Sequence, residues 1–146
     1  MKCEVGIILG SETDADTMSF CENKLSELGI KHIRIVASAH RNPELVRKWT
    51  REAYPAGIKV IIAAAGMSAA LPGVVAAQTP LPVIGVPMKS DLLGLDSLLS
   101  ISQMPKGVPV ACMSIGKHGA INAALFAKRI LDTREDYQDT DPPYGS

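Results

Sequence analysis

A histidine and an arginine stand side by side in the segment Ser38-Ala39-His40-Arg41-Asn42-Pro43, directly after a predicted strand. Imidazole titrates near neutral pH without help from its surroundings, so His40 suits proton transfer. The guanidinium of Arg41 is a bidentate fork that matches phosphate or carboxylate. We therefore expect proton-transfer chemistry on an anionic substrate at this segment.

Small and polar residues also follow the first and third predicted strands. Ser11 and Asp14 come after the first strand, and Gly66, Ser68 and Leu71 come after the third. Ligands of open parallel sheets bind at the carboxyl ends of the strands, so we expect these residues to lie beside the histidine and the arginine. Their backbone N–H groups could bind oxyanions. The serine and the aspartate could equally cap the following helix, and the glycine could serve only a tight turn.

Short apolar runs alternate with longer amphipathic stretches along the whole chain. The expected strands are 5–9, 32–37, 58–65, 82–86 and 108–113, and the expected helices are 15–28, 43–54, 69–78, part of 92–102, and 119–131. Strands that alternate with helices imply a parallel sheet covered by helices on both faces. The pattern predicts a three-layer α/β, flavodoxin-like fold with a five-stranded parallel sheet of order 2-1-3-4-5.

The length of 146 residues is typical of one domain. With 47% hydrophobic and 21% charged residues, the composition is that of an ordinary folded protein. We interpret residues 1–146 as a single domain in which 132–146 form a polar C-terminal tail.

Charge and hydropathy exclude several classes of partner. Fifteen basic and fifteen acidic side chains give zero net charge, and only 4% of residues are aromatic, which argues against nucleic-acid binding. No apolar stretch approaches the roughly 20 residues of a membrane span. The first residues lack the charged and apolar regions of a signal peptide. We expect a cytoplasmic protein that binds neither nucleic acid nor a membrane.

The cysteines point to the same compartment. Cys3, Cys21 and Cys112 lie far apart and form no CxxC spacing. We therefore expect neither a disulfide framework nor a zinc site. Free thiols are typical of a reducing compartment.

Six groups of residues occur in order along the chain. They are Gly10-Ser11-x-x-Asp14; Ser38-Ala39-His40-Arg41-x-Pro43; Leu71-Pro72-Gly73; Leu81-Pro82-Val83-Ile84-Gly85-Val86-Pro87; Gly94-Leu95-Asp96-Ser97-Leu98-Leu99-Ser100-Ile101 with Gln103-Met104-Pro105; and Ile115-Gly116-Lys117-x-Gly119-Ala120-x-Asn122-Ala123-Ala124-Leu125. In this order they resemble the N5-carboxyaminoimidazole ribonucleotide mutases of purine biosynthesis, the class I PurE family. The resemblance covers nearly the whole chain, from about Val5 to Leu131.

The resemblance implies conversion of N5-carboxyaminoimidazole ribonucleotide to 4-carboxy-5-aminoimidazole ribonucleotide. The implied steps are decarboxylation, recapture of CO2 at C4 and proton transfer by a histidine. The family's ligands are the ribonucleotide and CO2 or bicarbonate, with no cofactor and no metal. The resemblance also implies a homo-octamer and, as a functional partner, an ATP-dependent synthetase that supplies the carbamate substrate.

The resemblance also assigns roles to individual residues. The family's ribonucleotide-binding positions correspond to Ser11, Asp14 and Arg41, with Arg41 facing the phosphate. Ser38 and Ala39 line the same cleft, and His40 is the proton-transfer histidine. The loop that embraces the imidazole and the migrating carboxylate contains Gly66, Ser68 and Leu71.

The chain departs from the family pattern at three places. Ala70 stands where mutases have a second active-site histidine, and Met67-Ser68 is similar to the Arg-Ser of the branch that carboxylates aminoimidazole ribonucleotide directly. His118 replaces a frequent alanine and is either a surface histidine or a substitute for the missing imidazole. Direct carboxylation with CO2, carboxylation of another nucleotide-like ring, and a non-enzymatic flavodoxin-like binding module remain alternatives.

Overall fold

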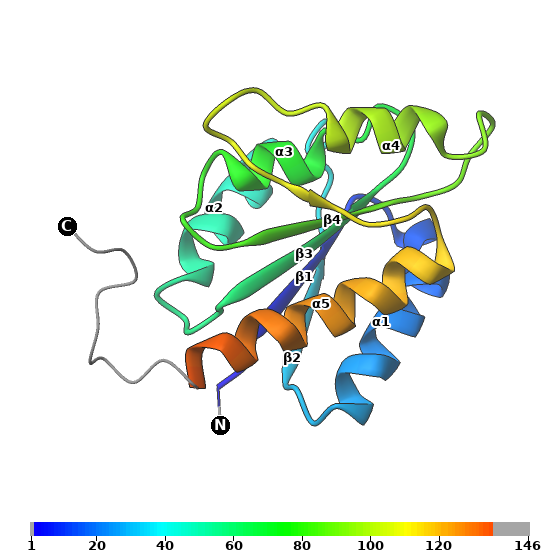
Figure 1. Ribbon diagram of the computed structural model, residues 1–146. Helices are drawn as coiled ribbons and strands as arrows, with labels where there is room; N and C mark the ends of the chain where they lie inside the picture. Colours follow the sequence, from blue (N-terminus) through cyan, green and yellow to red (C-terminus); the bar gives the residue numbers. More distant parts are fainter. Residues whose placement is uncertain (1, 136–146) are drawn as a thin grey trace.

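The computed structural model describes residues 2–135, which form a three-layer α/β fold (Figure 1). Five parallel strands make one sheet in the order β2-β1-β3-β4-β5. The strands are β1 (Val5–Leu9), β2 (His32–Val36), β3 (Val60–Ala65), β4 (Val83–Pro87) and β5 (Ala111–Cys112). The predicted fold class and strand order are both confirmed.

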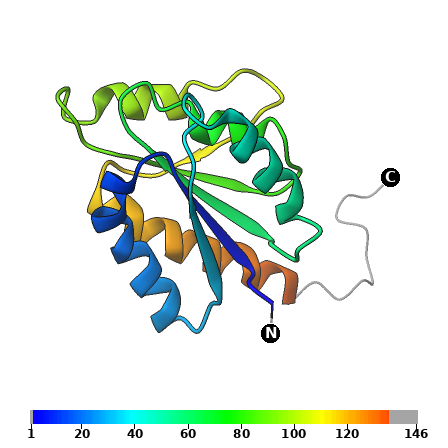
Figure 2. The ribbon, with the colours of Figure 1, turned by 180° about the vertical axis from the view of Figure 1, so that it is seen from behind.

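Helices cover both faces of the sheet, as the two opposite views show (Figures 1 and 2). One face carries α1 (Ala15–Glu27) and α5 (Lys117–Glu135), which also pack against each other. The other face carries α2 (Pro43–Ala53), α3 (Leu71–Ala76) and α4 (Leu95–Ser102). A single 3-10 turn, η1 (Glu12–Asp14), leads from β1 into α1. No helix within residues 2–135 is long and apolar enough to cross a membrane.

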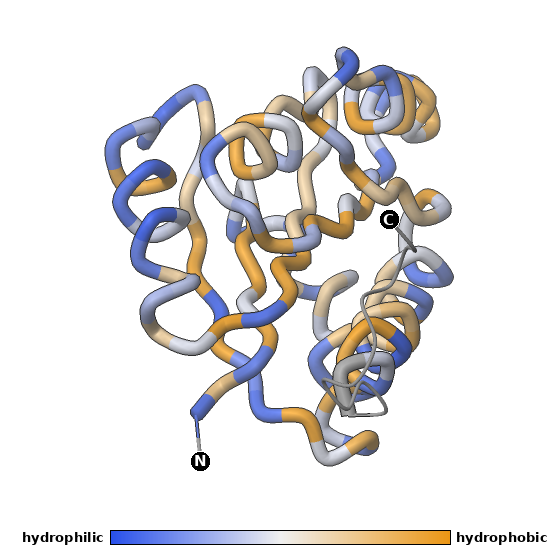
Figure 3. The backbone as a smooth tube through the Cα atoms, turned by 60° about the vertical axis from the view of Figure 1, so that its left-hand side comes forward, coloured by the Kyte–Doolittle hydropathy of each residue, from blue (hydrophilic) through white to orange (hydrophobic). Residues whose placement is uncertain are grey.

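The three central strands β1, β3 and β4 are buried along their whole length. Their continuous apolar sequences follow from this burial, because both faces of each strand meet a helical layer. Alternate side chains divide between two cores: Ile7 and Ile62 pack toward α1 and α5, whereas Ile8 and Ile61 pack toward α2 and α3. Figure 3 shows the apolar strands inside the molecule and helices around them whose outward faces carry the polar residues.

Two predicted boundaries at the end of the chain are wrong. The strand expected at 108–113 is reduced to Ala111–Cys112, partly because Pro109 has no N–H to donate to the ladder. The last helix extends to Glu135, so residues 132–135 are helical rather than part of a tail. The remainder of the predicted tail, 136–146, lies outside the described residues.

Gly85 permits α4 to approach β4 closely. A Cβ atom built on Gly85 would lie only 2.4 Å from Cγ2 of Ile101, a fully buried residue of α4. Contacts under about 3 Å do not occur for real Cβ atoms without displacement of a neighbour. The glycine therefore sets the spacing between the sheet and the helix that follows the fourth strand.

We predict that Gly85→Ala lowers the free energy of unfolding by about 1–3 kcal/mol, the usual cost of overpacking. Urea denaturation measures the change. Gly10→Ala is the matched control, because a Cβ there would meet its nearest neighbour at an ordinary 3.5 Å. Equal stability of Gly85→Ala and the wild type would contradict the close-approach explanation.

Candidate active site

A pocket of about 580 Å³ opens beyond the carboxyl ends of β1, β2, β3 and β4. It brings together every site residue expected from the sequence: Ser11, Asp14, Ser38, Ala39, His40, Arg41, Gly66, Ser68 and Leu71. The carboxyl ends of neighbouring parallel strands lie at one edge of the sheet, which explains why segments so distant in sequence meet here.

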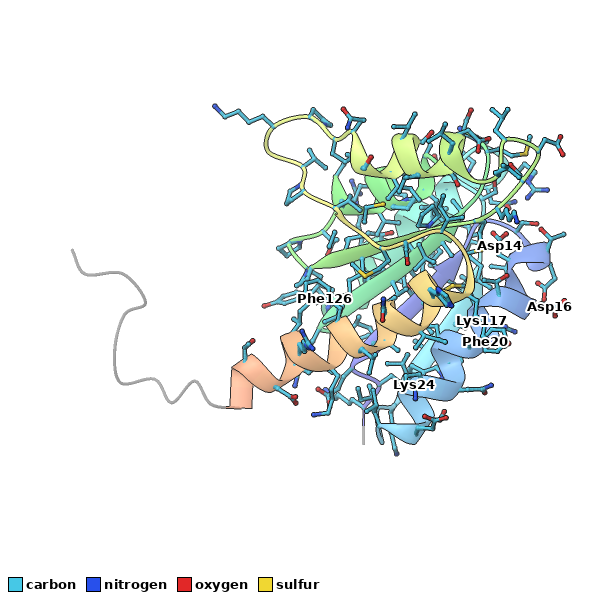
Figure 4. The ribbon with its side chains drawn as sticks, turned by 45° about the vertical axis from the view of Figure 1, so that its right-hand side comes forward. Asp14, Asp16, Phe20, Lys24, Lys117 and Phe126 are labelled. Atoms are coloured by element: carbon cyan, nitrogen blue, oxygen red, sulfur yellow. The ribbon has the colours of Figure 1, made fainter. Side chains whose placement is uncertain are left out.

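The loop after β1 gives different tasks to Ser11 and Asp14. The Ser11 hydroxyl caps η1 by accepting the backbone N–H of Thr13 at 3.3 Å, and it also bonds the Thr13 hydroxyl at 2.9 Å. Asp14 precedes α1 but makes no capping hydrogen bond with its side chain. Figure 4 shows Asp14 at the start of α1. The capping alternative therefore holds for the serine, while the aspartate side chain does not cap the helix.

Burial raises the pKa of Asp14 from its usual 3.8 to about 6. A hydrogen bond from the Ser11 backbone and the positive charge of Arg41 both lower the pKa, but desolvation is the largest effect. The carboxyl group consequently changes charge close to neutral pH, within the same pocket as His40.

The Ser38 hydroxyl organises the loop after β2. Its oxygen accepts the backbone N–H groups of His40 at 3.3 Å and Arg41 at 3.1 Å. The Ser38 carbonyl accepts the backbone N–H of Asn42 at 2.8 Å. Since these bonds fix the backbone of the His–Arg pair, Ser38 acts on the pocket by shaping the loop as well as by lining it.

Arg41 connects the first two loops of the pocket. Arg41 lies in the loop after β2, and its Nη2 donates at 3.1 Å to the carbonyl of Gly10 in the loop after β1. One edge of the guanidinium is thus anchored while the residue remains exposed. An anchored guanidinium is well suited to present its remaining N–H groups to an anion.

The loop after β3 forms the apolar side of the pocket. Its lining residues run from Ala65 to Leu71 and include Ala70, the position where the resembled family has a histidine. Gly66 packs against Met88, the residue that follows β4, because a Cβ on Gly66 would lie 3.3 Å from the Cβ of Met88. No imidazole in the described chain replaces the missing side chain, since His40 is the only histidine that lines this pocket.

Sequence reasoning did not select the pocket residues Thr13, Met88, Lys89 and Ser90. The last three follow β4 directly, where the strand-end rule points, but their residue types gave no further sign of ligand binding. Lys89 adds a cation to the rim of the pocket, and it is exposed. Lys89 and Arg41 thus place two cationic side chains at the pocket, which favours a negatively charged ligand.

The loop after β5 does not contribute to the pocket. Lys117 instead lies over the ring of Phe20 on α1, 4.5 Å from its centroid, as Figure 4 shows. His118 is exposed in the first turn of α5. The structure thus favours the surface interpretation of His118 over its role as a substitute for the missing imidazole.

Comparison with known proteins agrees with this arrangement. A family model described as AIR carboxylase matches residues 4–140. The chain belongs to the AIR carboxylase family. The resemblance seen in the sequence motifs is therefore confirmed at the level of the family.

Two relatives in the family carry the same name, N5-carboxyaminoimidazole ribonucleotide mutase. The Pseudomonas aeruginosa protein is 52% identical over 135 residues, which cover 92% of this chain and 83% of that protein. The Bacillus subtilis protein is 53% identical over 133 residues, which cover 90% of this chain and 82% of that protein. A solved structure of Treponema denticola PurE2 has a TM-score of 0.80 at 31% identity, covering 91% of this chain and 82% of that chain.

The raised pKa of Asp14 predicts a pH-dependent effect of Asp14→Asn on stability. The folded-state pKa of about 6 lies above the unfolded-state value, so ionisation of Asp14 opposes folding. The penalty is fully present above the folded-state pKa and fades as the pH falls toward the unfolded-state value. Asn mimics the neutral acid. The free energy of unfolding of Asp14→Asn should therefore exceed that of the wild type by of the order of 2 kcal/mol at about pH 7.5, and by much less at about pH 4.5.

Urea denaturation at the two pH values measures this difference. Asp16→Asn is the matched control, because Asp16 lies two residues after Asp14, in the first turn of α1, but is exposed. A gain of equal size at both pH values would show that the charge of Asp14 is not its source.

Proposed function

We propose that this chain converts N5-carboxyaminoimidazole ribonucleotide to 4-carboxy-5-aminoimidazole ribonucleotide in purine biosynthesis. The observation that carries the proposal is a single pocket that joins a histidine and an anchored arginine to an apolar loop of small residues. Relatives of 52% and 53% identity that bear the name of this mutase support it further.

The distribution of charge across the pocket suggests how the ribonucleotide lies. Its phosphate would meet Arg41 and the loop of Ser11, where guanidinium and backbone N–H groups are available. Its imidazole ring would lie toward the loop of Gly66 and Ser68. Asp14 lines the same pocket and senses the charge of Arg41, so its carboxylate could accept hydrogen bonds from the ribose hydroxyls.

The proposed reaction moves one carboxyl group and one proton. The N–C bond of the carbamate breaks, its nitrogen takes up a proton, and CO2 is released inside the pocket. C4 of the ring then bonds to CO2, and loss of the C4 proton restores aromaticity. His40 would donate the first proton as an acid and remove the second as a base, so its protonation state is restored after each turnover.

The apolar loop supports retention of CO2 beside C4. Small residues such as Ala69 and Ala70 would let the ring and CO2 approach the backbone closely. Proximity of this kind contributes roughly 7–11 kcal/mol to catalysis in favourable cases. Phosphate binding at the far end of the pocket would provide the binding energy that aligns the ring.

We further propose that the chain forms a homo-octamer, acts in the cytoplasm and receives its substrate from an ATP-dependent synthetase. Exposed leucines support self-association: Leu92, Leu93, Leu95 and Leu99, in and before α4, are 50–69% exposed. Because Cys3, Cys21 and Cys112 are all unpaired, they are consistent with a reducing compartment.

A paired turnover assay tests the proposed function. One reaction receives freshly generated N5-carboxyaminoimidazole ribonucleotide, and the other receives aminoimidazole ribonucleotide with high bicarbonate. We expect 4-carboxy product mainly in the first reaction, at a rate above the uncatalysed background. Product mainly in the second would assign direct carboxylation, and no product in either reaction from folded protein would overturn both activities.

His40→Asn should lower kcat by about 10²–10⁴-fold, the usual contribution of general acid–base catalysis. Asparagine keeps the polar shape but transfers no proton, so substrate affinity should remain close to that of the wild type. His118→Asn is the matched control, since this exposed histidine lies outside the pocket, and its kcat should not change. A His40→Asn variant with nearly full activity would remove His40 from the proposed mechanism.

A further inference from the structure

Met67 combines an unfavourable backbone conformation with an exposed apolar side chain at the mouth of the pocket. Its φ is 59°, and among residues 2–135 the only other non-glycine residue with a positive φ is Leu93. This conformation crowds Cβ against the backbone, so it is unfavourable for residues other than glycine. Burial does not offset the strain, because 66% of Met67 is exposed.

The surroundings of Met67 hold its loop in this conformation. The Met67 carbonyl accepts the backbone N–H of Ala69 at 2.9 Å, and the Ala65 carbonyl accepts the backbone N–H of Met88 at 2.9 Å. Gly66, between these bonds, packs against Met88. A strained residue that its neighbours hold in place at a ligand site is a recurrent sign of function.

The position of Met67 in the pocket suggests what this function is. Met67 lines the side formed by the loop after β3, where the proposed orientation places the imidazole ring. The groups proposed to bind phosphate and ribose come from the loops of Arg41 and Asp14 instead. A methionine side chain has three rotatable bonds and a polarisable sulfur, so it adapts its shape to an aromatic ring.

We propose that Met67 is a specificity-determining residue whose side chain covers the imidazole ring of the bound ribonucleotide and keeps water from it. This inference rests on the proposed function, which supplies the ring and its orientation. The left-handed backbone conformation holds the Met67 side chain at the rim of the pocket. The flexible thioether then closes over the ligand only when a ring is present. A ligand without the ring gains nothing from this cover.

Calorimetric binding of two ligands tests the inference: 4-carboxy-5-aminoimidazole ribonucleotide and ribose 5-phosphate, which lacks the ring. Met67→Ala removes the thioether but keeps Cβ, and with it the same backbone requirement. We expect it to weaken ribonucleotide binding by about tenfold, while ribose 5-phosphate binding stays unchanged. Met67→Leu, similar in volume, should restore most of the ribonucleotide affinity.

Leu93→Ala is the matched control. Leu93 has the same φ of 59° and is 69% exposed, but it does not line the pocket. The Leu93→Ala variant should bind both ligands like the wild type. Unchanged ribonucleotide affinity in Met67→Ala, or equal losses for both ligands, would overturn the role of Met67 alone. Failure of the folded wild type to bind the ribonucleotide would overturn the proposed function, and this inference with it.

Discussion

Helices cover both faces of β1, β3 and β4, and this double burial controls where polar groups can stand. A charged side chain in the middle of one of these strands would lose its hydration without a partner. The polar chemistry is therefore confined to the segments beyond the strand ends. There the backbone leaves the sheet, and hydrogen bonds such as that from Arg41 to the Gly10 carbonyl join neighbouring loops.

Much of the candidate site could be predicted from the sequence, because its place in the fold follows from this topology. His40 and Arg41 could be selected by residue type after one strand, and the parallel order then placed them beside Ser11 and Gly66. The same rule at the end of β4 locates Lys89, but a lone lysine after a strand has no signature that separates it from a solvated one.

Other features depend on geometry that residue types do not encode. The hydroxyl of Ser38 could bind a ligand or its own loop, and only the coordinates show it accepting the N–H groups of His40 and Arg41. Methionine has no preference for positive φ, so nothing in the sequence marks Met67 as strained. The end of α5 at Glu135 was missed because polar residues suit the last turns of an exposed helix as well as a tail.

The environment of Asp14 couples the pocket to the proton balance of the solution. With a pKa of about 6, this carboxyl group is partly protonated in mildly acidic buffer. A ligand that prefers one charge state of Asp14 therefore releases protons to the buffer or takes them up from it when it binds. The heat of binding near this pH consequently includes the ionisation heat of the buffer, so enthalpies are comparable only between measurements in the same buffer.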